Sequence, residues 1–187
     1  ILYRLVGSEM CIRDRTLCEN YGFVQLSTGD MLREAKKDES ELGRKVAGIM
    51  AKGELVTDDI VIGLIEKNLT NKQNDIGFIF DGFPRTVNQA IALDEMLNEK
   101  TLSIDNLISL EVDDDELISR IKKRALVSGR IDDQSEEKIN KRLEEYDNKT
   151  KPLINFYKIQ EKFISINGVG EFNEVTNRLI STIDSKI

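Results

Sequence analysis

Two hydroxyls, a glycine and an arginine stand close together in QLSTGDMLR, residues 25–33. The pattern predicts that a strand ends here and a helix begins, and a helix N-terminus presents free backbone N–H groups that favour an anion. We expect Arg33 on the first turn, where its planar guanidinium can reach the same anion. The same residues also fit a plain capping motif, with Ser27 or Thr28 as the N-cap and Arg33 in solvent.

An aspartate follows an apolar run in GFIFDGFPRT, residues 77–86. A residue that ends a strand of an open α/β sheet lies at the carboxyl edge, where ligands bind. Asp81 can there hold Mg²⁺, directly or through water, beside the phosphates of a nucleotide. Gly82 allows close approach of the backbone, Pro84 stiffens the turn and Arg85 projects from it. The alternative is an aspartate that caps the next helix, beside an incidental arginine.

Four arginines lie in and around ALVSGRIDDQ, residues 125–134: Arg120, Arg124, Arg130 and Arg142. Phosphoryl transfer asks a protein mainly for positioning and positive charge, so a histidine base is not required. Arginines on a mobile flap would supply that charge only when the flap closes. Charges on helix faces are nevertheless more often solvated than catalytic, and the pattern alone favours surface positions for Arg120 and Arg142.

Short apolar runs alternate with helical patterns along the chain. The predicted strands are 23–27, 77–83, 106–112 and 163–167, and the predicted helices are 58–69, 87–100, 113–124 and 136–160. Such alternation predicts an α/β fold with a doubly wound parallel sheet covered by helices on both faces. Pro152 predicts a kink or break in the last helix. Residues 40–55 and 125–136 fall outside the alternation and are candidates for small mobile insertions.

Composition excludes several classes of protein. The 187 residues are enough for one sizeable core, and a net charge of −7 disfavours binding to nucleic acid or anionic membranes. The longest apolar runs are too short to cross a membrane, and no signal peptide is recognisable. The chain has no histidine and only Cys11 and Cys18, so we expect a cytoplasmic protein without zinc or a disulfide framework.

The strings LSTGDMLR, DGFPRTVNQA and SGRIDDQ…KRLEEY together resemble the adenylate kinase family, and the resemblance runs from Thr16 to the C-terminus. Three motifs in family order and with family spacing make it very specific. The resemblance implies a P-loop NTPase-like nucleoside monophosphate kinase that uses Mg²⁺ with ATP. Its partners would be ATP, AMP and ADP.

The resemblance also implies a role for individual residues. Gln89 would read the adenine edge of AMP, Arg33 and Arg85 would hold its α-phosphate, and Asp81 would hold Mg²⁺ through water. The implied AMP-binding set is Thr28, Gly29, Arg33, Glu54, Leu55, Val56, Gly82, Phe83, Pro84, Arg85, Gln89, Arg130 and Arg142. The implied catalytic set is Arg85, Arg124, Arg130 and Arg142, and Arg124 and Gly170 would contact ATP.

We therefore expect a single kinase domain over residues 1–187 with two insertions. Residues 27–56 would form a small helical AMP-binding flap, and residues 125–136 a short lid without cysteine ligands and so without zinc. Between Asp133 and Arg142 the chain carries one residue more than the commonest short lid, which affects the helical phase of Arg142.

A UMP/CMP kinase of the same fold is the nearest competitor. Those enzymes tend to have alanine where Thr28 stands, and asparagine after the Phe-Pro-Arg turn where this chain has Thr86 and then Gln89. Both differences favour adenine, since an unpaired buried polar group costs roughly 1–3 kcal/mol.

The glycine-rich loop that the family uses to cradle ATP phosphates is missing. Its lysine should fall near Met10, but no Gly-Lys pair occurs in the chain, and Gly7 is the one glycine in that region. The stretch LVGSEMCIRDR, residues 5–15, resembles the in-frame translation of a transposon-end sequencing adapter. We expect residues 1–15 to be non-native and native sequence to begin at about Thr16. A natural pseudo-enzyme and a kinase with a diverged loop are the alternatives.

These observations predict a gene for an adenylate kinase, which converts Mg-ATP and AMP into two ADP by direct in-line transfer. The polypeptide itself should be inactive, because loss of the phosphate cradle removes more than roughly 4 kcal/mol of transition-state stabilisation. The rival from another class is a noncatalytic AMP-binding module. We expect a monomer, since no exposed apolar stripe is apparent.

Overall fold

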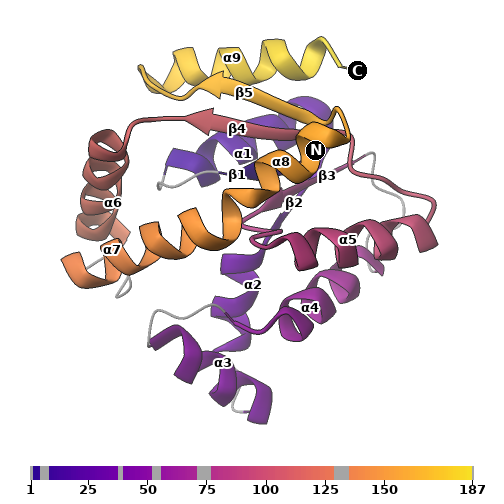
Figure 1. Cartoon of the computed structure of the whole chain (residues 1–187), viewed down its shortest axis with the longest axis vertical. Coiled ribbons are helices and arrows are strands. Elements are labelled where there is room, and N and C mark those ends of the chain that lie inside the picture. Colours follow the sequence, from indigo (N-terminus) through magenta and orange to yellow (C-terminus); the bar gives the residue numbers. More distant parts are fainter. Residues whose placement is uncertain are drawn as a thin grey trace.

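The fold is built on one five-stranded parallel sheet. The structure is a computed structural model and describes residues 2–4, 9–37, 40–51, 56–70, 77–128 and 135–186. The strands are β1 (Leu2–Arg4), β2 (Val24–Ser27), β3 (Phe78–Asp81), β4 (Leu107–Glu111) and β5 (Phe163–Asn167), in the order β2-β3-β1-β4-β5. Every pairing is parallel. The four predicted strands and the doubly wound parallel sheet are therefore confirmed (Figure 1).

Strands β2, β3 and β4 are one to three residues shorter than their predicted runs, because ladder pairing ends before the apolar residues do, whereas β5 spans the predicted residues 163–167. The central strand, β1, comes from the N-terminal residues. Its neighbours are β3 and β4, with Leu2 opposite both Phe80 and Leu107. The apolar start of the chain thus occupies the interior position of the sheet.

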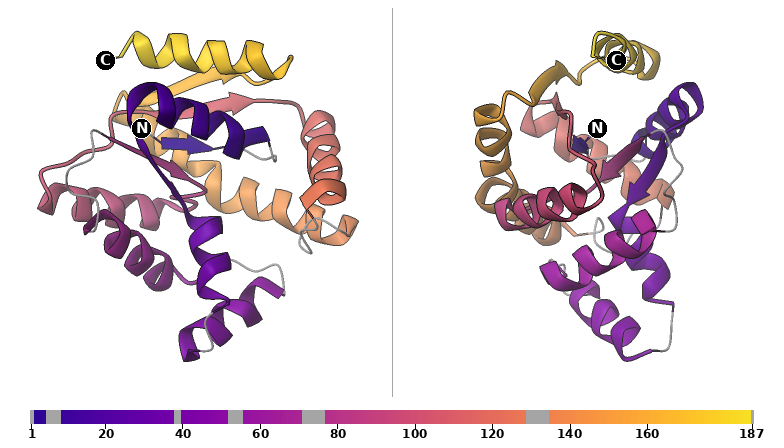
Figure 2. Two further views of the ribbon diagram at one scale, coloured as in Figure 1. Left: turned by 180° about the vertical axis from the view of Figure 1, so that it is seen from behind. Right: turned by 90° about the vertical axis from the view of Figure 1, so that its right-hand side faces the viewer.

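Helices cover both faces of the sheet (Figures 1 and 2). Those of the sheet region are α1 (Glu9–Tyr21), α4 (Asp58–Thr70), α5 (Val87–Glu99), α8 (Pro152–Ile159) and α9 (Phe172–Asp184). Figure 2 shows α1 and α9 on one face and α5 and α8 on the other. A parallel sheet needs this arrangement, because both faces of its strands are apolar.

Two hydrophobic clusters fill the spaces between the layers. One joins Leu17 of α1 and Leu179 of α9 to Ile79 and Ile108 of the sheet. The other joins Ile65 of α4, Leu93 of α5 and Tyr157 of α8 to the opposite face of the sheet. The opposite directions of successive side chains in a strand explain this division: Ile79 faces the first cluster and Phe80 the second.

Two smaller helical units extend from the layers. The first contains α2 (Thr28–Ala35) and α3 (Glu41–Ala51), at the bottom of Figure 1. The second contains α6 (Asp114–Ser128) and α7 (Glu136–Glu145), which pack through Leu117, Ile121 and Ile139. Helix α6 extends through Ser128, four residues beyond its predicted end at residue 124, and so includes the first residues of the predicted lid. The rest of that stretch, residues 129–134, lies outside the described residues.

The predicted break near Pro152 is confirmed. Helix α7 passes into a π-helical segment, η2 (Tyr146–Thr150), and α8 then begins with Pro152 at its first position. Proline lacks the N–H that a continuous α-helix would require there, so the hydrogen-bond pattern changes just before it. None of the described helices has the length and apolar character needed to cross a membrane.

Candidate functional site

The two motifs after β2 and β3 meet at the carboxyl edge of the sheet. Ser27 and Asp81 are opposite each other in the parallel register, and Ser27 Oγ donates to Asp81 Oδ2 at 3.0 Å. Thr28 Oγ1 lies 3.2 Å from the carbonyl oxygen of Asp81 and 3.1 Å from that of Gly82, so its hydroxyl binds the turn after β3. Residues more than fifty positions apart therefore form one polar site.

The start of α2 combines the two alternatives considered for QLSTGDMLR. Ser27 is the N-cap, and its Oγ accepts from the N–H of Asp30 at 3.4 Å. Arg33 is on the last turn of α2, so the prediction of the first turn was wrong: the helix begins at Thr28 and spans only eight residues. Its guanidinium pairs with Asp30 and lies next to Gly29: a Cβ added to Gly29 would be only 3.1 Å from Arg33 Nη1. The charge is therefore still beside the helix N-terminus.

The turn after β3 requires glycine. Gly82 has a φ of +74°, and a Cβ there would lie 3.0 Å from Thr28 Oγ1. Phe83 and Pro84 are buried, and Arg85 Nε donates to the carbonyl oxygen of Gly82 at 2.8 Å. The backbone of the turn and the Arg85 guanidinium are thus held close to the start of α2, as a site for a phosphate requires.

Gln89 is buried on the first turn of α5, 3% exposed. The turn is capped by Thr86, whose Oγ1 accepts from the Gln89 N–H at 3.1 Å. The side-chain amide has two further partners: Oε1 accepts from the N–H of Arg85 at 2.7 Å, and Nε2 donates to Asp58 Oδ1 at 2.6 Å. The amide is therefore held from both sides beside the arginine turn.

Two charged residues of α1 are buried near the same edge. Arg13 and Asp14 are 2% and 1% exposed. Gln25 Nε2 donates to Asp14 Oδ2 at 2.7 Å, while Asp14 Oδ1 has no hydrogen-bond partner in the part of the chain that the structure describes. Burial first, and then the negative charge of Asp81, raise the pKa of Asp14 from 3.8 to about 8; the Gln25 hydrogen bond and the Arg13 charge oppose this rise.

The loop between β5 and α9 is held by two arginines. Arg120 is half-buried rather than on the surface as predicted, and its Nη2 donates to the carbonyl oxygen of Gly168 at 3.0 Å. Arg178 Nη1 donates to the carbonyl oxygens of Asn167 and Val169, at 2.9 and 2.6 Å. Gly170, the predicted ATP contact, follows with a φ of +127°. These contacts hold its backbone at the end of β5.

The remaining predicted site residues are described only in part. Arg124 belongs to α6 and Arg142 to α7, but their side chains lie outside the described part of the chain, as do Arg130, Glu54 and Leu55. Val56 is buried in the cluster with α4 and α5. The structure therefore joins Thr28, Gly29, Arg33, Asp81, Gly82 to Arg85 and Gln89 into one site, and leaves the arginines of the lid as predictions.

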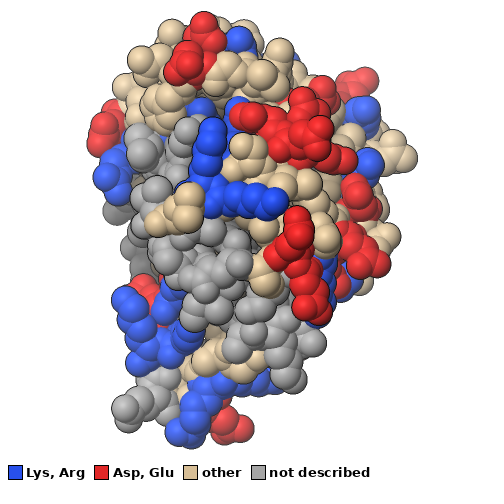
Figure 3. Space-filling model, turned by 90° about the vertical axis from the view of Figure 1, so that its left-hand side faces the viewer, with Lys and Arg blue, Asp and Glu red and all other residues tan. Residues whose placement is uncertain are grey.

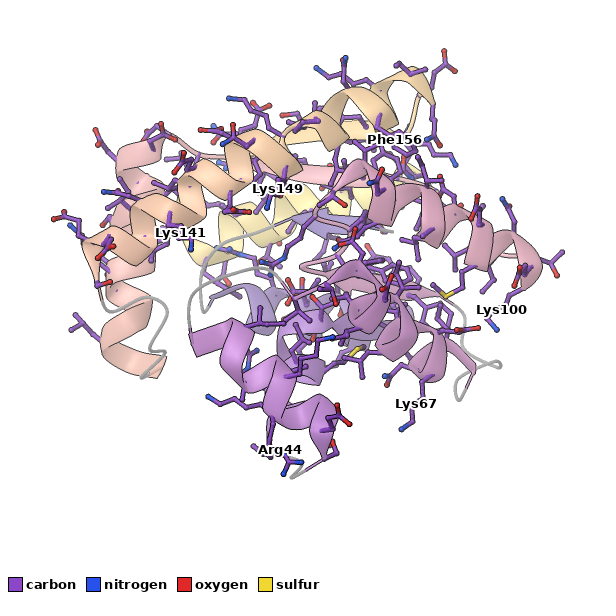
Figure 4. The ribbon with its side chains drawn as sticks, turned by 60° about the horizontal axis from the view of Figure 1, so that its bottom comes forward. Arg44, Lys67, Lys100, Lys141, Lys149 and Phe156 are labelled. Atoms are coloured by element: carbon purple, nitrogen blue, oxygen red, sulfur yellow. The ribbon has the colours of Figure 1, made fainter. Side chains whose placement is uncertain are left out.

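Basic and acidic side chains are interspersed on the surface. Figure 3 shows Lys and Arg as well as Asp and Glu on both sides of one face, with the largest group of acidic side chains toward the right. Figure 4 shows Arg44 on α3 and Lys67 on α4 toward the bottom of the view, well apart from Lys141 on α7 and Lys149 on η2. These basic residues therefore belong to separate elements and not to one cluster.

Three residues of the site were not recognised in the sequence. Asp58 was only the first residue of the predicted helix 58–69, Asp14 was only part of the stretch 5–15 that we expect to be non-native, and Thr150 belonged to no motif. Thr150 Oγ1 donates to the carbonyl oxygen of Arg85 at 2.9 Å, so η2 supports the arginine turn. No local signal could have identified these residues, because each acts on an element far away in the sequence.

Known proteins resemble this chain over most of its length. A family model described as adenylate kinase matches residues 7–162. An adenylate kinase of Flavobacterium psychrophilum is 42% identical over 99% of this chain and 97% of that protein. An adenylate kinase of Maricaulis maris is 45% identical over 100% and 98%, and one of a Caulobacter species is 47% identical over 88% and 87%.

Proposed function

Because this chain belongs to the adenylate kinase family, whose members are nucleoside monophosphate kinases, we propose that its gene encodes an enzyme that converts Mg-ATP and AMP into two ADP. One observation carries the proposal most directly. The hydrogen bonds of Thr28 and Gln89 join the ends of β2 and β3 and the start of α5 into one buried polar site with two arginines. Adenine and a phosphate can be bound together there.

The AMP side would use residues of this site in two ways. Arg33, beside Gly29, and Arg85, beside Gly82, are planar forks that suit a phosphate. Gln89 would read the base, and the exclusion of water from a buried amide strengthens that reading. Glu54, Leu55 and Val56 complete the proposed AMP flap, which we assign to residues 27–56.

Magnesium fits the carboxyl edge. Mg²⁺ in such sites is bound by one or two carboxylates together with substrate phosphates. Asp81 ends β3 there, and its negative charge adds to burial, the larger cause, in raising the pKa of the nearby Asp14 carboxyl. When bound with ATP, Mg²⁺ would neutralise the charge that develops on the phosphates. The residues of the proposed AMP site and the arginines would orient the two nucleotides.

Transfer itself needs no covalent enzyme intermediate. An oxygen of the AMP phosphate attacks the γ-phosphorus of ATP, and the bond from that phosphorus to the bridging β–γ oxygen breaks. Arg85, Arg124, Arg130 and Arg142 would supply the positive charge around the moving group, and Arg124 and Gly170 would contact ATP. The lid, residues 125–136, would bring its arginine to the nucleotides by closing.

The segment before Thr16 separates the function of the gene from that of this polypeptide. We assign Leu5–Arg15 to translated adapter sequence in place of the phosphate-binding loop. The two buried charges on α1 support this, because a helix packed against a sheet normally places apolar residues there, and a carboxyl oxygen of Asp14 is unsatisfied within the described structure. The nucleotide record tests the assignment, which is wrong if the bases do not spell an adapter.

A coupled assay of ATP-to-AMP transfer tests the function. We expect the unmodified chain to be at least about a thousandfold slower than a variant with a family glycine-rich loop ending in Gly-Lys before Thr16. The matched control carries the same loop but keeps Met10, and it should remain slow because it lacks the lysine. Full activity of the unmodified chain would contradict this proposal.

The same variants distinguish the competing functions. A noncatalytic AMP-binding module predicts tight AMP binding without ATP and no transfer by the restored chain. A UMP/CMP kinase predicts faster transfer to UMP or CMP than to AMP. Gel filtration of the unmodified chain tests the expected monomer.

A further inference from the structure

Gln89 meets a carboxylate on one side of its amide and a backbone N–H on the other. Asp58 Oδ1 lies 2.6 Å from Nε2, and the N–H of Arg85 lies 2.7 Å from Oε1. A carboxylate oxygen only accepts hydrogen bonds and a backbone N–H only donates them. The orientation of the amide is therefore determined by chemistry: a flip would bring two acceptors together at Asp58 and two donors together at Arg85.

Within the described part of the chain, the amide keeps one donor and one acceptor for a ligand. A glutamine amide has two N–H groups and an oxygen with two lone pairs, and the contacts to Asp58 and Arg85 use one of each. The remaining N–H and lone pair can bind a base edge that offers an acceptor beside a donor. Adenine offers this pair, with an amino group at position 6 beside a ring nitrogen. A 6-oxopurine offers the reverse along its 1,6-edge, a carbonyl at position 6 and an N–H at position 1, and would pair with a flipped amide.

We propose that Asp58 is a positioning residue that holds the Gln89 amide in one orientation and so makes this site select adenine over a 6-oxopurine. The inference rests on the proposed binding of AMP at Gln89 and adds the residue that determines its base preference. Burial strengthens the selection, because Gln89 is 3% exposed and a mismatched base could not replace its lost hydrogen bonds with water.

NMR titration of the full-length chain with AMP and with inosine 5′-monophosphate tests the proposal. The two ligands differ only at the 1,6-edge of the purine, and titration measures dissociation constants even when binding is weak. The unmodified chain should bind AMP about tenfold or more tightly than the inosine nucleotide, as expected for a bidentate contact. Asp58→Asn, which can accept or donate at this position, should reduce that ratio at least about fivefold, since only the Arg85 N–H then opposes a flip.

Asp59→Asn is the matched control. Asp59 is the next residue, is exposed and lies in the same first turn of α4, so its replacement removes the same charge from the same helix end. The ratio of the two affinities should stay within about twofold of the unmodified value, since any effect on the helix dipole acts on both ligands alike. If Asp58→Asn does not fold, Asp58→Ser removes the same acceptor with a side chain that suits a helix start.

The Asp58→Asn variant tests the inference, whereas the unmodified chain tests the proposed function. If the unmodified chain binds AMP but Asp58→Asn weakens both nucleotides equally, Asp58 is merely structural and the inference is overturned. If the unmodified chain shows no AMP-dependent shifts near Thr28, Gly82 and Gln89, the proposed AMP site itself is overturned, and the base selection with it. If the preference for AMP over the inosine nucleotide falls in Asp58→Asn and not in Asp59→Asn, the result supports both the AMP site and the positioning role of Asp58.

Discussion

Replacing Asp14 with asparagine should stabilise the folded chain, and the gain should grow with pH. Asp14 is almost completely buried on α1, where burial and then the charge of Asp81 raise its pKa from 3.8 to about 8. Asparagine cannot ionise, and its carbonyl oxygen can still accept the hydrogen bond that Gln25 donates to the carboxyl group. The substitution therefore removes the charge and keeps the contact.

The sign follows from proton linkage. Below about pH 4 the Asp14 carboxyl is protonated in both the folded and the unfolded chain. Between about pH 4 and pH 8 the folded chain keeps a proton that the unfolded chain loses, so the free energy of unfolding falls as pH rises. Above about pH 8 Asp14 is ionised in both the folded and the unfolded chain, and the free energy of unfolding falls no further through this group.

The magnitude follows from the same pKa values. The difference between 3.8 and about 8 corresponds to a loss on the order of 5 kcal/mol at high pH. The stability advantage of Asp14→Asn should therefore be small at pH 4 and rise by about 1.4 kcal/mol per pH unit between pH 5 and pH 7. It should level off above about pH 8. A loss this large is comparable to the whole stability of many domains.

Urea unfolding of the two chains at several pH values measures the difference directly, and other titrating groups cancel in the comparison. Glu19→Gln is the matched control, since Glu19 is an exposed acid on the same helix. Its stability difference should not vary with pH by more than about 0.5 kcal/mol. An advantage of Asp14→Asn that is absent, or equal at pH 5 and pH 8, would refute the reasoning. In an Asp81→Asn background, the stability advantage of Asp14→Asn should level off at a lower pH, because the second cause of the raised Asp14 pKa is then removed.

Two further substitutions test the phosphate site. Gly82→Ala should lower the free energy of unfolding by about 1–3 kcal/mol in urea, because φ is +74° and the new Cβ would lie 3.0 Å from Thr28 Oγ1; unchanged stability would mean that the turn tolerates a side chain. Arg33→Ala should weaken AMP binding at least about tenfold by calorimetry while changing stability by less than about 0.5 kcal/mol, since its ion pair with Asp30 is exposed. A large loss of stability with unchanged affinity would assign Arg33 to the fold instead.

Local patterns were sufficient to predict most of the architecture. Apolar runs of strand length and helical spacing depend on a few neighbouring residues, so the four predicted strands and the helices between them could be recognised. The position of Asp81 at the carboxyl edge could also be predicted, because a residue that ends a strand of an open α/β sheet lies there. Pro152 predicted the helix break for an equally local reason.

The finer geometry of the site could not be predicted in this way. Arg33 was placed one turn too early because a short helix gives no periodic signal with which to locate its start. Arg120 was expected in solvent, but it is half-buried and binds the loop after β5. Its burial depends on how α6 lies relative to the loop after β5, and no pattern within α6 encodes that.

The sequence by itself determined the family, the parallel sheet and the identity of the residues at the carboxyl edge of the sheet, because these depend on short motifs and local periodicity. Only the tertiary structure decided which partners those residues have. Asp58 reaches Gln89 across 31 positions of the chain, Thr150 reaches Arg85 across 65, and Asp14 is buried near Asp81. Such contacts depend on how helices pack against the sheet, and packing is set by the whole core rather than by any one segment.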